Sequence, residues 1–162
     1  MRTRDVSDML LLGGIWGGAF ALQRVSVPAF GAVPLAAVRI GVALCVLLIF
    51  LRDRQLLREQ PLRLLTLGAM NTAIPFSLYA YAMLNITSGL AALLNATTPM
   101  FGALIARLWL GERLTGVRVA GIVIAFAGVA WLVRDAIGTL GGGVIPGVCP
   151  ALLGAACYGF SA

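Results

Sequence analysis

The sequence predicts an all-α, polytopic helical membrane protein, built as one five-helix repeat followed by a truncated sixth transmembrane helix. Hydrophobic residues make up 60% of the 162 residues, only 11% are charged, and the mean hydropathy is +0.99. Soluble domains carry about 25% charged residues, so this composition indicates a chain that crosses a bilayer several times. The charged residues also gather between long apolar segments, which leaves those segments free to enter lipid.

Five segments are long and apolar enough to cross the hydrocarbon core, which needs about 20 residues of helix. They are residues 9–27, 34–51, 63–84, 86–110 and 117–133. A sixth segment begins near Val144. Counted from Pro150 to the last residue, its thirteen residues extend only about 20 Å as a helix, short of the roughly 30 Å required. We therefore expect an incomplete sixth span.

The arginines predict the orientation of the spans. The formal net charge is +6 and every basic residue is an arginine, which favours a bacterial, GC-rich origin. With the N-terminus inside, the cytoplasmic side carries Arg2, Arg4, Arg52, Arg54, Arg58, Arg63, Arg113 and Arg118. The other side has only Arg134 in a loop, and this bias predicts a cytoplasmic N-terminus in the bacterial inner membrane. Arginines placed in short loops are topology signals, so nucleic acid is not an expected partner.

Several kinds of chemistry are excluded by composition. The chain has no histidine, which rules out Ser-His-Asp and Cys-His catalysis and His-liganded metal sites. The three cysteines do not form a CxxC pattern, and neither paired carboxylates nor a nucleotide-binding motif is present. We expect no enzyme activity, no metal and no cofactor.

Two proline motifs mark candidate cavity residues. "NTAIP" (71–75) and "NATTP" (95–99) each place a proline four residues after an asparagine inside an apolar segment. Proline cannot donate to the carbonyl four residues earlier, so the turn opens near mid-membrane. Kinked helices packed by side-chain hydrogen bonds are one interpretation. The other is a polar substrate cavity, for which the candidates are Asn71, Pro75, Asn95, Thr98 and Pro99.

Other candidates come from aromatic and charged residues. Trp16 and Phe20 share one face of the first span and are predicted to form an aromatic wall. Tyr79 is a further cavity candidate. Arg39 enters the second span without a carboxylate nearby, so it is either an interfacial anchor or an anion-binding group. Glu112 is a structural or gating candidate, explained equally by pairing with a loop arginine.

Glycine-rich stretches occur in both the first and the last apolar segments. Overlapping GxxxG patterns surround Trp16, and we expect them to pack against a neighbouring helix. The stretch "LLGGIWGGAFA" (11–21) also aligns with "LLGAACYGFSA" (152–162) at an offset of 141 residues. Five spans separate the two copies, and an odd number of spans inverts a second repeat in the membrane. The sequence therefore predicts that a second repeat begins near residue 146.

These residues also resemble a known family. "LGGIWGGAFAL", "AAVRIGVAL" and "LLNATTPMFGALIARLWLGERLTGVRVAGIVIAFAGVAWLV" resemble the EamA repeat of the drug/metabolite transporter superfamily. The resemblance covers residues 8–134, leaving 135–145 as an external loop and 146–162 as the start of a second repeat. It implies a permease that moves small metabolites or drugs through a cavity between two inverted five-helix repeats.

The resemblance implies three partners: the lipid bilayer, a small-molecule substrate, and a second EamA repeat. Two other functions remain open at this stage. One is an accessory or structural membrane subunit whose polar groups serve only packing. The other is a half-transporter that works as an oligomer, as in small multidrug exporters, although those are expected to carry an acidic residue in the first span, and residues 9–27 contain none.

Overall fold

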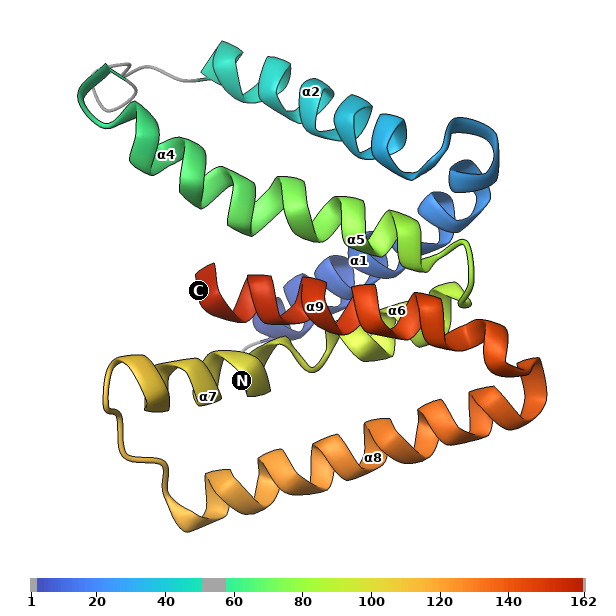
Figure 1. Cartoon of the computed structure of the whole chain (residues 1–162). Coiled ribbons are helices and arrows are strands. Elements are labelled where there is room, and N and C mark those ends of the chain that lie inside the picture. The colour runs from blue at the N-terminus through green and yellow to red at the C-terminus, as the bar shows by residue number, and fades with distance from the viewer. Residues whose placement is uncertain (1–2, 51–57, 162) are drawn as a thin grey trace.

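The computed structural model describes residues 3–50 and 58–161 (Figure 1). Its elements are α1 (Thr3–Phe30), α2 (Ala32–Phe50), α4 (Pro61–Gly68), the π-helical turn η1 (Ala69–Ala73), α5 (Ile74–Ala82), α6 (Ser88–Asn95), α7 (Thr98–Trp109), α8 (Gly116–Leu140), the 3-10 turn η2 (Gly142–Val144) and α9 (Ile145–Ser161). These ranges contain helices and no strand, so the predicted all-α class is confirmed.

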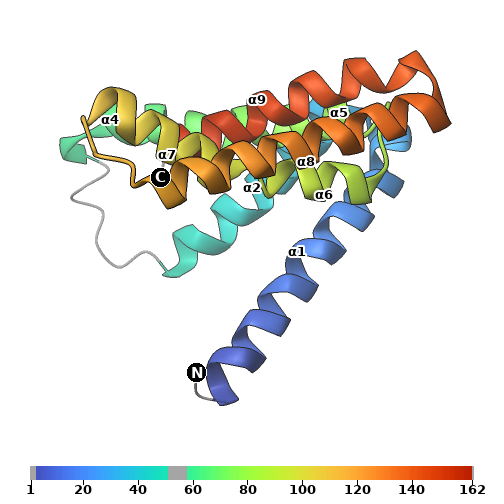
Figure 2. The same ribbon diagram turned by 90° about the horizontal axis from the view of Figure 1, so that it is seen from below.

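The helices form a layer in which chain order and spatial order differ. Across Figure 1 the order is α2, the continuous α4–α5 rod, α9, the α6–α7 pair and α8. The last helix, α9, therefore lies in the middle, packed against α5 and α7. The first helix, α1, crosses behind this layer, and Figure 2 shows its N-terminal half extending away from the other helices.

Five helical segments of the described residues are long and apolar enough to cross a membrane. They are Asp5–Phe30, Ala32–Phe50, Ser88–Trp109, Gly116–Thr139 and Gly142–Ser161. This set differs from the sequence prediction at two places. The predicted third span, α4 to α5, falls outside it because the segment includes polar residues such as Arg63, Thr66 and Asn71. The segment Gly142–Ser161, which the sequence predicts to be an incomplete span, belongs to this set.

The sixth span begins near Val144, as the sequence predicts, but counting its helical length only from Pro150 is wrong. The helix α9 begins at Ile145 and carries Pro150 inside it, so 17 residues are helical rather than thirteen. Apolar helices tolerate an internal proline when neighbours satisfy the freed backbone groups. The predicted loop 135–145 is also shorter than expected, because α8 continues to Leu140. The chain then turns at Gly141, whose φ of +80° favours glycine and whose N–H donates to the Ile137 carbonyl at 2.9 Å.

The two prolines interrupt their helices, as the sequence predicts. Before Pro75 the backbone widens into η1, and the N–H of Ile74 donates to the Ala69 carbonyl, five residues earlier. At Pro99 the interruption is a full break between α6 and α7. There the Thr98 hydroxyl donates to the Asn95 carbonyl at 2.8 Å, so a side chain replaces the missing backbone donor.

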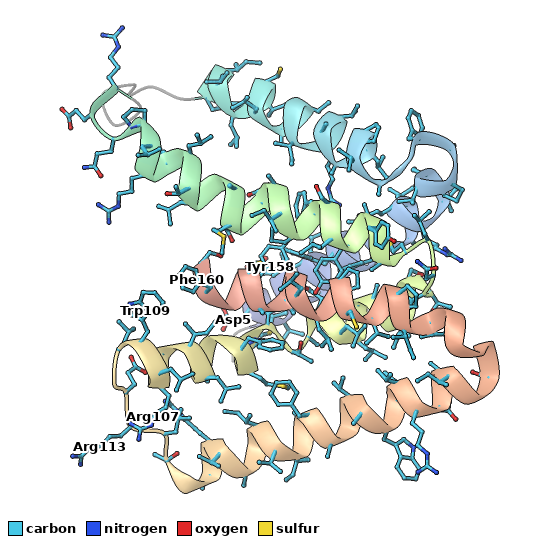
Figure 3. The ribbon with its side chains drawn as sticks, viewed as in Figure 1. Asp5, Arg107, Trp109, Arg113, Tyr158 and Phe160 are labelled. Atoms are coloured by element: carbon cyan, nitrogen blue, oxygen red, sulfur yellow. The ribbon has the colours of Figure 1, made fainter. Side chains whose placement is uncertain are left out.

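The core lies where α9 meets α5 and α6. Fully or nearly fully buried apolar residues gather there: Tyr79, Ala82, Met83, Ile86, Leu90, Ala91, Leu94, Val144, Val148 and Ala151. Glycines on α9 allow this close packing. A Cβ added at Gly147 would lie 2.8 Å from the Ala82 carbonyl oxygen, and one added at Gly159 would lie 2.6 Å from the backbone nitrogen of Gly102. At the same end as Gly159, Phe160 packs edge-on against Trp109 at a centroid distance of 5.5 Å (Figure 3).

The glycine patterns of α1 behave differently. Added Cβ atoms at Gly13, Gly14, Gly17 and Gly18 would meet no atom within 4 Å. The expectation that this GxxxG face packs against a neighbour is therefore wrong for the described residues. Cβ atoms added at Gly121 and Gly128 of α8 would likewise meet no atom within 4 Å. These faces are exposed because α1 projects away from the layer and α8 lies at its edge.

Arginines lie at both ends of the layer. The connection from α7 to α8, with Glu112 and Arg113, lies at the same end as the start of α4, where Arg58 and Arg63 lie (Figure 1). At the opposite end, Arg24 on α1 donates a hydrogen bond to the carbonyl of Met83, which caps the C-terminus of α5. A cation at this position satisfies an otherwise unpaired carbonyl and complements the helix dipole.

Candidate functional site

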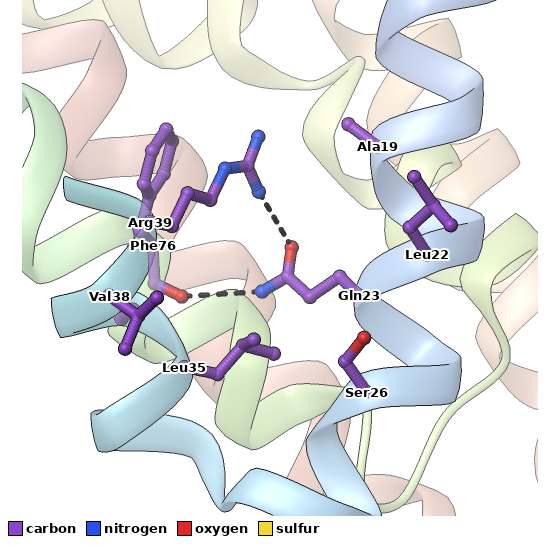
Figure 4. Close-up of a pocket in the computed structure, with 9 residues that line it drawn as sticks. Ala19, Leu22, Gln23, Ser26, Leu35, Val38, Arg39 and Phe76 are labelled. Carbon is purple, nitrogen blue, oxygen red and sulfur yellow. Dashed lines mark hydrogen bonds between the residues drawn. The ribbon is translucent and has the colours of Figure 1, made fainter. Parts of the chain in front are cut away.

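Arg39 is the centre of the candidate site. It lies on α2, half-buried, and its guanidinium carbon is 4.3 Å from the centre of the Phe76 ring on α5. Its Nη1 donates to Oε1 of Gln23 on α1 at 3.2 Å (Figure 4). A guanidinium over an aromatic face is attracted by the ring quadrupole, and more strongly where water is excluded. The side chain of Arg39 therefore contacts both α1 and α5.

Gln23 fixes the position of Arg39. The side chain is buried, with 8% of its surface exposed, and its Nε2 donates to the main-chain carbonyl of Phe76 at 3.5 Å (Figure 4). One amide thus joins α1, α2 and α5 through its two polar ends. A buried network in which each member has a partner rigidifies the groups it joins.

An open pocket of about 270 Å³ adjoins this network. Its wall is mostly aliphatic, with Arg39 and Gln23 as polar groups at one side: Ala19, Leu22, Gln23, Ser26, Leu35, Ala36, Val38, Arg39 and Phe76 line it. We call it the outer pocket. An apolar wall with a few placed polar groups is the usual composition of a small-molecule site.

A second, smaller space lies on the aromatic side of Arg39. This inner compartment holds about 10 Å³ and is lined by Trp16, Ala19, Phe20, Gln23, Arg39, Phe76, Tyr79 and Tyr158. Four of these residues line both spaces: Ala19, Gln23, Arg39 and Phe76. The compartment has room for about one water-sized group. Arg39 therefore borders a narrow space and a wide one.

The rings of the inner compartment pack on one another. Phe20 meets Tyr79 edge-on at a centroid distance of 5.7 Å, and Tyr79 stacks on Tyr158 at 6.2 Å. Tyr79 is 2% exposed, and its hydroxyl has no hydrogen-bond partner among the described residues. A buried hydroxyl without a partner costs free energy, which makes it an unusual feature to retain.

Four predicted site residues, Trp16, Phe20, Arg39 and Tyr79, come together here. Pro75 is buried next to Phe76 in the chain. Asn95, Thr98 and Pro99 lie at the α6–α7 break and outside both spaces, as does Asn71, whose Oδ1 accepts a hydrogen bond from Ser161 at 3.0 Å. A role for these four in a substrate cavity stays a prediction.

Glu112 lies in the connection from α7 to α8, and it lines neither of the two spaces beside Arg39. No ion pair to its carboxylate forms among residues 3–50 and 58–161, so the expected pairing with a loop arginine is not seen there. Instead Arg107 donates to the main-chain carbonyl of Glu112 at 3.4 Å. The arginine satisfies a carbonyl after the end of α7, which leaves the carboxylate exposed.

Three residues of the site were not predicted: Gln23, Phe76 and Tyr158. Gln23 follows Phe20 by three residues, so the helical spacing already places it on the Trp16 face. Phe76 follows Pro75 directly, and nothing in the sequence distinguishes it from other apolar residues of that span. Tyr158 comes from α9, whose packing against α5 is a tertiary relationship without a local signal.

The charge of the site is unbalanced. The six acidic residues of the chain are Asp5, Asp8, Asp53, Glu59, Glu112 and Asp135, and none lies within 9–52 or 60–111. Arg39 makes no ion pair within the described part of the chain. A cation held at membrane depth by a neutral amide and an aromatic ring has strong attraction for an anionic group.

The fold defines the class: a multi-pass helical membrane protein, here with an open, mostly aliphatic pocket between its helices. The sequence matches the EamA-like transporter family over residues 8–134. This chain belongs to that family, and the predicted resemblance is confirmed with the same bounds.

Relatives of the chain are transporters or carry uninformative names. It is similar to a "Probable terminal-alkyne amino-acid exporter" of Streptantibioticus cattleyicolor, with 32% identity over 79% of this chain and 44% of the relative. It is also similar to an "Uncharacterized transporter" of Archaeoglobus fulgidus (29% identity, 70% of this chain, 42% of the relative). A third relative is "Protein PagO" of Salmonella typhimurium (28% identity, 83% and 46%). The chain thus spans less than half the length of these relatives, and no solved structure gives a significant match.

Proposed function

We propose that the chain is the first half of a secondary transporter that moves small amphipathic metabolites with an anionic group across the bacterial inner membrane. The observation that carries the proposal is Arg39, which lies beside an open pocket and has no carboxylate within the spans that surround it. The positive charge attracts an anion, and the aliphatic wall of the outer pocket accommodates an apolar part of the same molecule. The name of the Streptantibioticus relative, "Probable terminal-alkyne amino-acid exporter", supports a small substrate with an anionic group, because an amino acid carries a carboxylate.

The proposed partner of this half is a second repeat that begins with α9. The stretch 152–162 aligns with 11–21, so Gly154 corresponds to Gly13 and Gly159 to Gly18. On α9 both glycines are in tight contact, with Tyr79 and with Gly102, whereas their α1 counterparts meet nothing. We infer that the glycine face of α1 packs in the same way against the helices of the second repeat that correspond to α5 and α7.

A second copy of this chain does not fit that role as well. The groove between α5 and α7 that would receive α1 from another copy already holds α9. The arginine bias also favours one orientation in the membrane, whereas an inverted pairing of identical copies needs two. These two points favour a second repeat that begins with α9 and continues in the same polypeptide, with the N-terminus in the cytoplasm.

The test of the proposed function is transport by the complete polypeptide in inverted membrane vesicles. Arg39→Lys keeps the charge but loses the planar fork that contacts Gln23 and an anion together. We expect Arg39→Lys to lose most transport and Arg39→Gln to lose nearly all of it, with normal membrane levels. Arg107→Lys, which changes an exposed arginine outside the site, is the matched control. Full transport by Arg39→Gln would show that Arg39 has only a packing role, and it would contradict the proposed anionic substrate.

A further inference from the structure

We propose that Tyr79 is a second ligand-binding group of the site, and that together with Arg39 it binds the carboxylate of a substrate whose short apolar chain occupies the outer pocket. This inference rests on the proposed function, and it assigns the chemistry of the substrate more narrowly. The observation behind it is the hydroxyl of Tyr79, which is buried without a hydrogen-bond partner among the described residues.

Burying the hydroxyl of Tyr79 without a hydrogen-bond partner costs folding free energy. The side chain is 2% exposed, and no acceptor contacts its hydroxyl in the described part of the chain. Phenylalanine would keep the edge-on contact with Phe20 and the stacking on Tyr158 without that cost. A hydroxyl at this position therefore gains a favourable interaction only when an acceptor enters from outside.

The inner compartment limits what that acceptor can be. Tyr79 and Arg39 line the same space, which has room for about one water-sized group. A single oxygen atom fits there, and an oxygen between a guanidinium and a phenol hydroxyl accepts from both. The rest of the molecule must lie outside, because a volume of about 10 Å³ is filled by one such group.

The outer pocket accounts for the rest of the substrate. It shares Arg39 and Gln23 with the inner compartment, and at about 270 Å³ it is much larger. Its other lining residues include Leu22, Leu35 and Val38, which favour an aliphatic chain. A carboxylate places one oxygen in the inner compartment and keeps its second oxygen near Arg39, while its chain extends into the outer pocket. A neutral amide lacks the charge that Arg39 attracts, and an ammonium group is repelled.

The experiment is ligand binding by the purified protein in nanodiscs, followed by thermal shift. The probes are butanoate, hexanoate and octanoate, each compared with the amide of the same chain. We expect the carboxylates to raise the melting temperature and the amides to have little effect. Tyr79→Phe should weaken carboxylate binding by about 10- to 100-fold, the usual effect of losing one hydrogen bond to a charged group. Without ligand its melting temperature should be unchanged or higher.

Tyr81→Phe is the matched control, because Tyr81 is two residues away in the same helix and half-exposed. It should bind the probes as wild type does. The inference is overturned if no carboxylate binds wild type, if the amides bind equally well, or if Tyr79→Phe binds normally. It is also overturned if Tyr79→Phe alone lowers the melting temperature, because the hydroxyl would then have a partner within the protein. None of these results bears on whether transport depends on Arg39, so failure of the proposed function is recognised separately.

Discussion

The ring of Tyr79 occupies the space that a side chain at Gly154 would need. A Cβ added at Gly154 would lie 2.9 Å from Cε2 of Tyr79 and 3.2 Å from Cδ2, closer than carbon atoms pack. The ring cannot move freely, because it packs on Phe20 on one side and on Tyr158 on the other. The last helix of the chain therefore sets the position of a residue in the candidate site.

We predict that Gly154→Ala lowers stability and disturbs the site together. Overpacking of a close-packed interior costs about 1–3 kcal/mol, and here the displaced atom belongs to Tyr79. Unfolding in mixed micelles measures the cost, and the thermal shift with carboxylate measures the site. Gly121→Ala on α8 is the control, because its Cβ meets nothing within 4 Å and alanine favours a helix. Equal stability of the two variants would contradict this packing.

The contact between α7 and α9 predicts that alanine at Gly159 lowers stability more than alanine at Gly102 does. A Cβ at Gly159 would lie 2.6 Å from the backbone nitrogen of Gly102, which cannot give way without moving α7. A Cβ at Gly102 would lie 3.5 Å from the Gly159 carbonyl oxygen, an ordinary contact. Gly159→Ala should therefore destabilise by about 1–3 kcal/mol, and Gly102→Ala by less than half as much, in the same unfolding assay. Equal losses would show that the two helices do not meet in this register.

We predict that the Thr98 hydroxyl contributes more to the free energy of unfolding when residue 99 is proline than when it is alanine. Thr98→Val removes the donor to the Asn95 carbonyl and should cost about 0.5–1.5 kcal/mol, the usual net contribution of a hydrogen bond, because this one is only partly buried. Thr98→Ser, which keeps the hydroxyl, is the control. In a Pro99→Ala background residue 99 regains an N–H that can serve the same carbonyl, so Thr98→Val should cost less there. A double-mutant cycle measures this difference, and strict additivity would contradict the proposed compensation.

The sequence predicts the fold better than the site, and the residues show why. Apolar length and the two prolines are local signals, so the spans and the breaks at Pro75 and Pro99 follow from them. Where local signals mislead, the structure corrects them: α9 is helical through Pro150, and it lies in the middle of the layer. The site depends on contacts among α1, α2, α5 and α9, and only the residues on the Trp16 face of α1 share a local pattern. Tyr158 joins them through tertiary packing alone.

The orientation of the layer can be tested at its two ends. Thr139, near the end of α8, and Arg113, in the connection from α7 to α8, are exposed at opposite ends of that helix (Figure 3 labels Arg113). In a variant lacking the native Cys45, Cys149 and Cys157, a membrane-impermeant thiol reagent applied to intact cells should label Thr139→Cys and not Arg113→Cys. The reason is the arginine bias, which retains the end with Arg113 in the cytoplasm. The reverse labelling would contradict the proposed orientation, and labelling of both would indicate two orientations.

The free glycine face of α1 gives the sharpest test of the second repeat. In the 162-residue chain, Gly13→Leu should leave the free energy of unfolding nearly unchanged, because a side chain there meets no atom within 4 Å. In the complete polypeptide the same substitution should destabilise by about 1–3 kcal/mol, because Gly13 would then contact the residue that corresponds to Tyr79. Gly138→Leu on α8, equally free of neighbours, is the control and should be tolerated in both forms. If Gly13→Leu is as harmless in the complete polypeptide as in this chain, α1 and α9 do not pack in equivalent ways, and the glycine face of α1 has another partner or faces lipid.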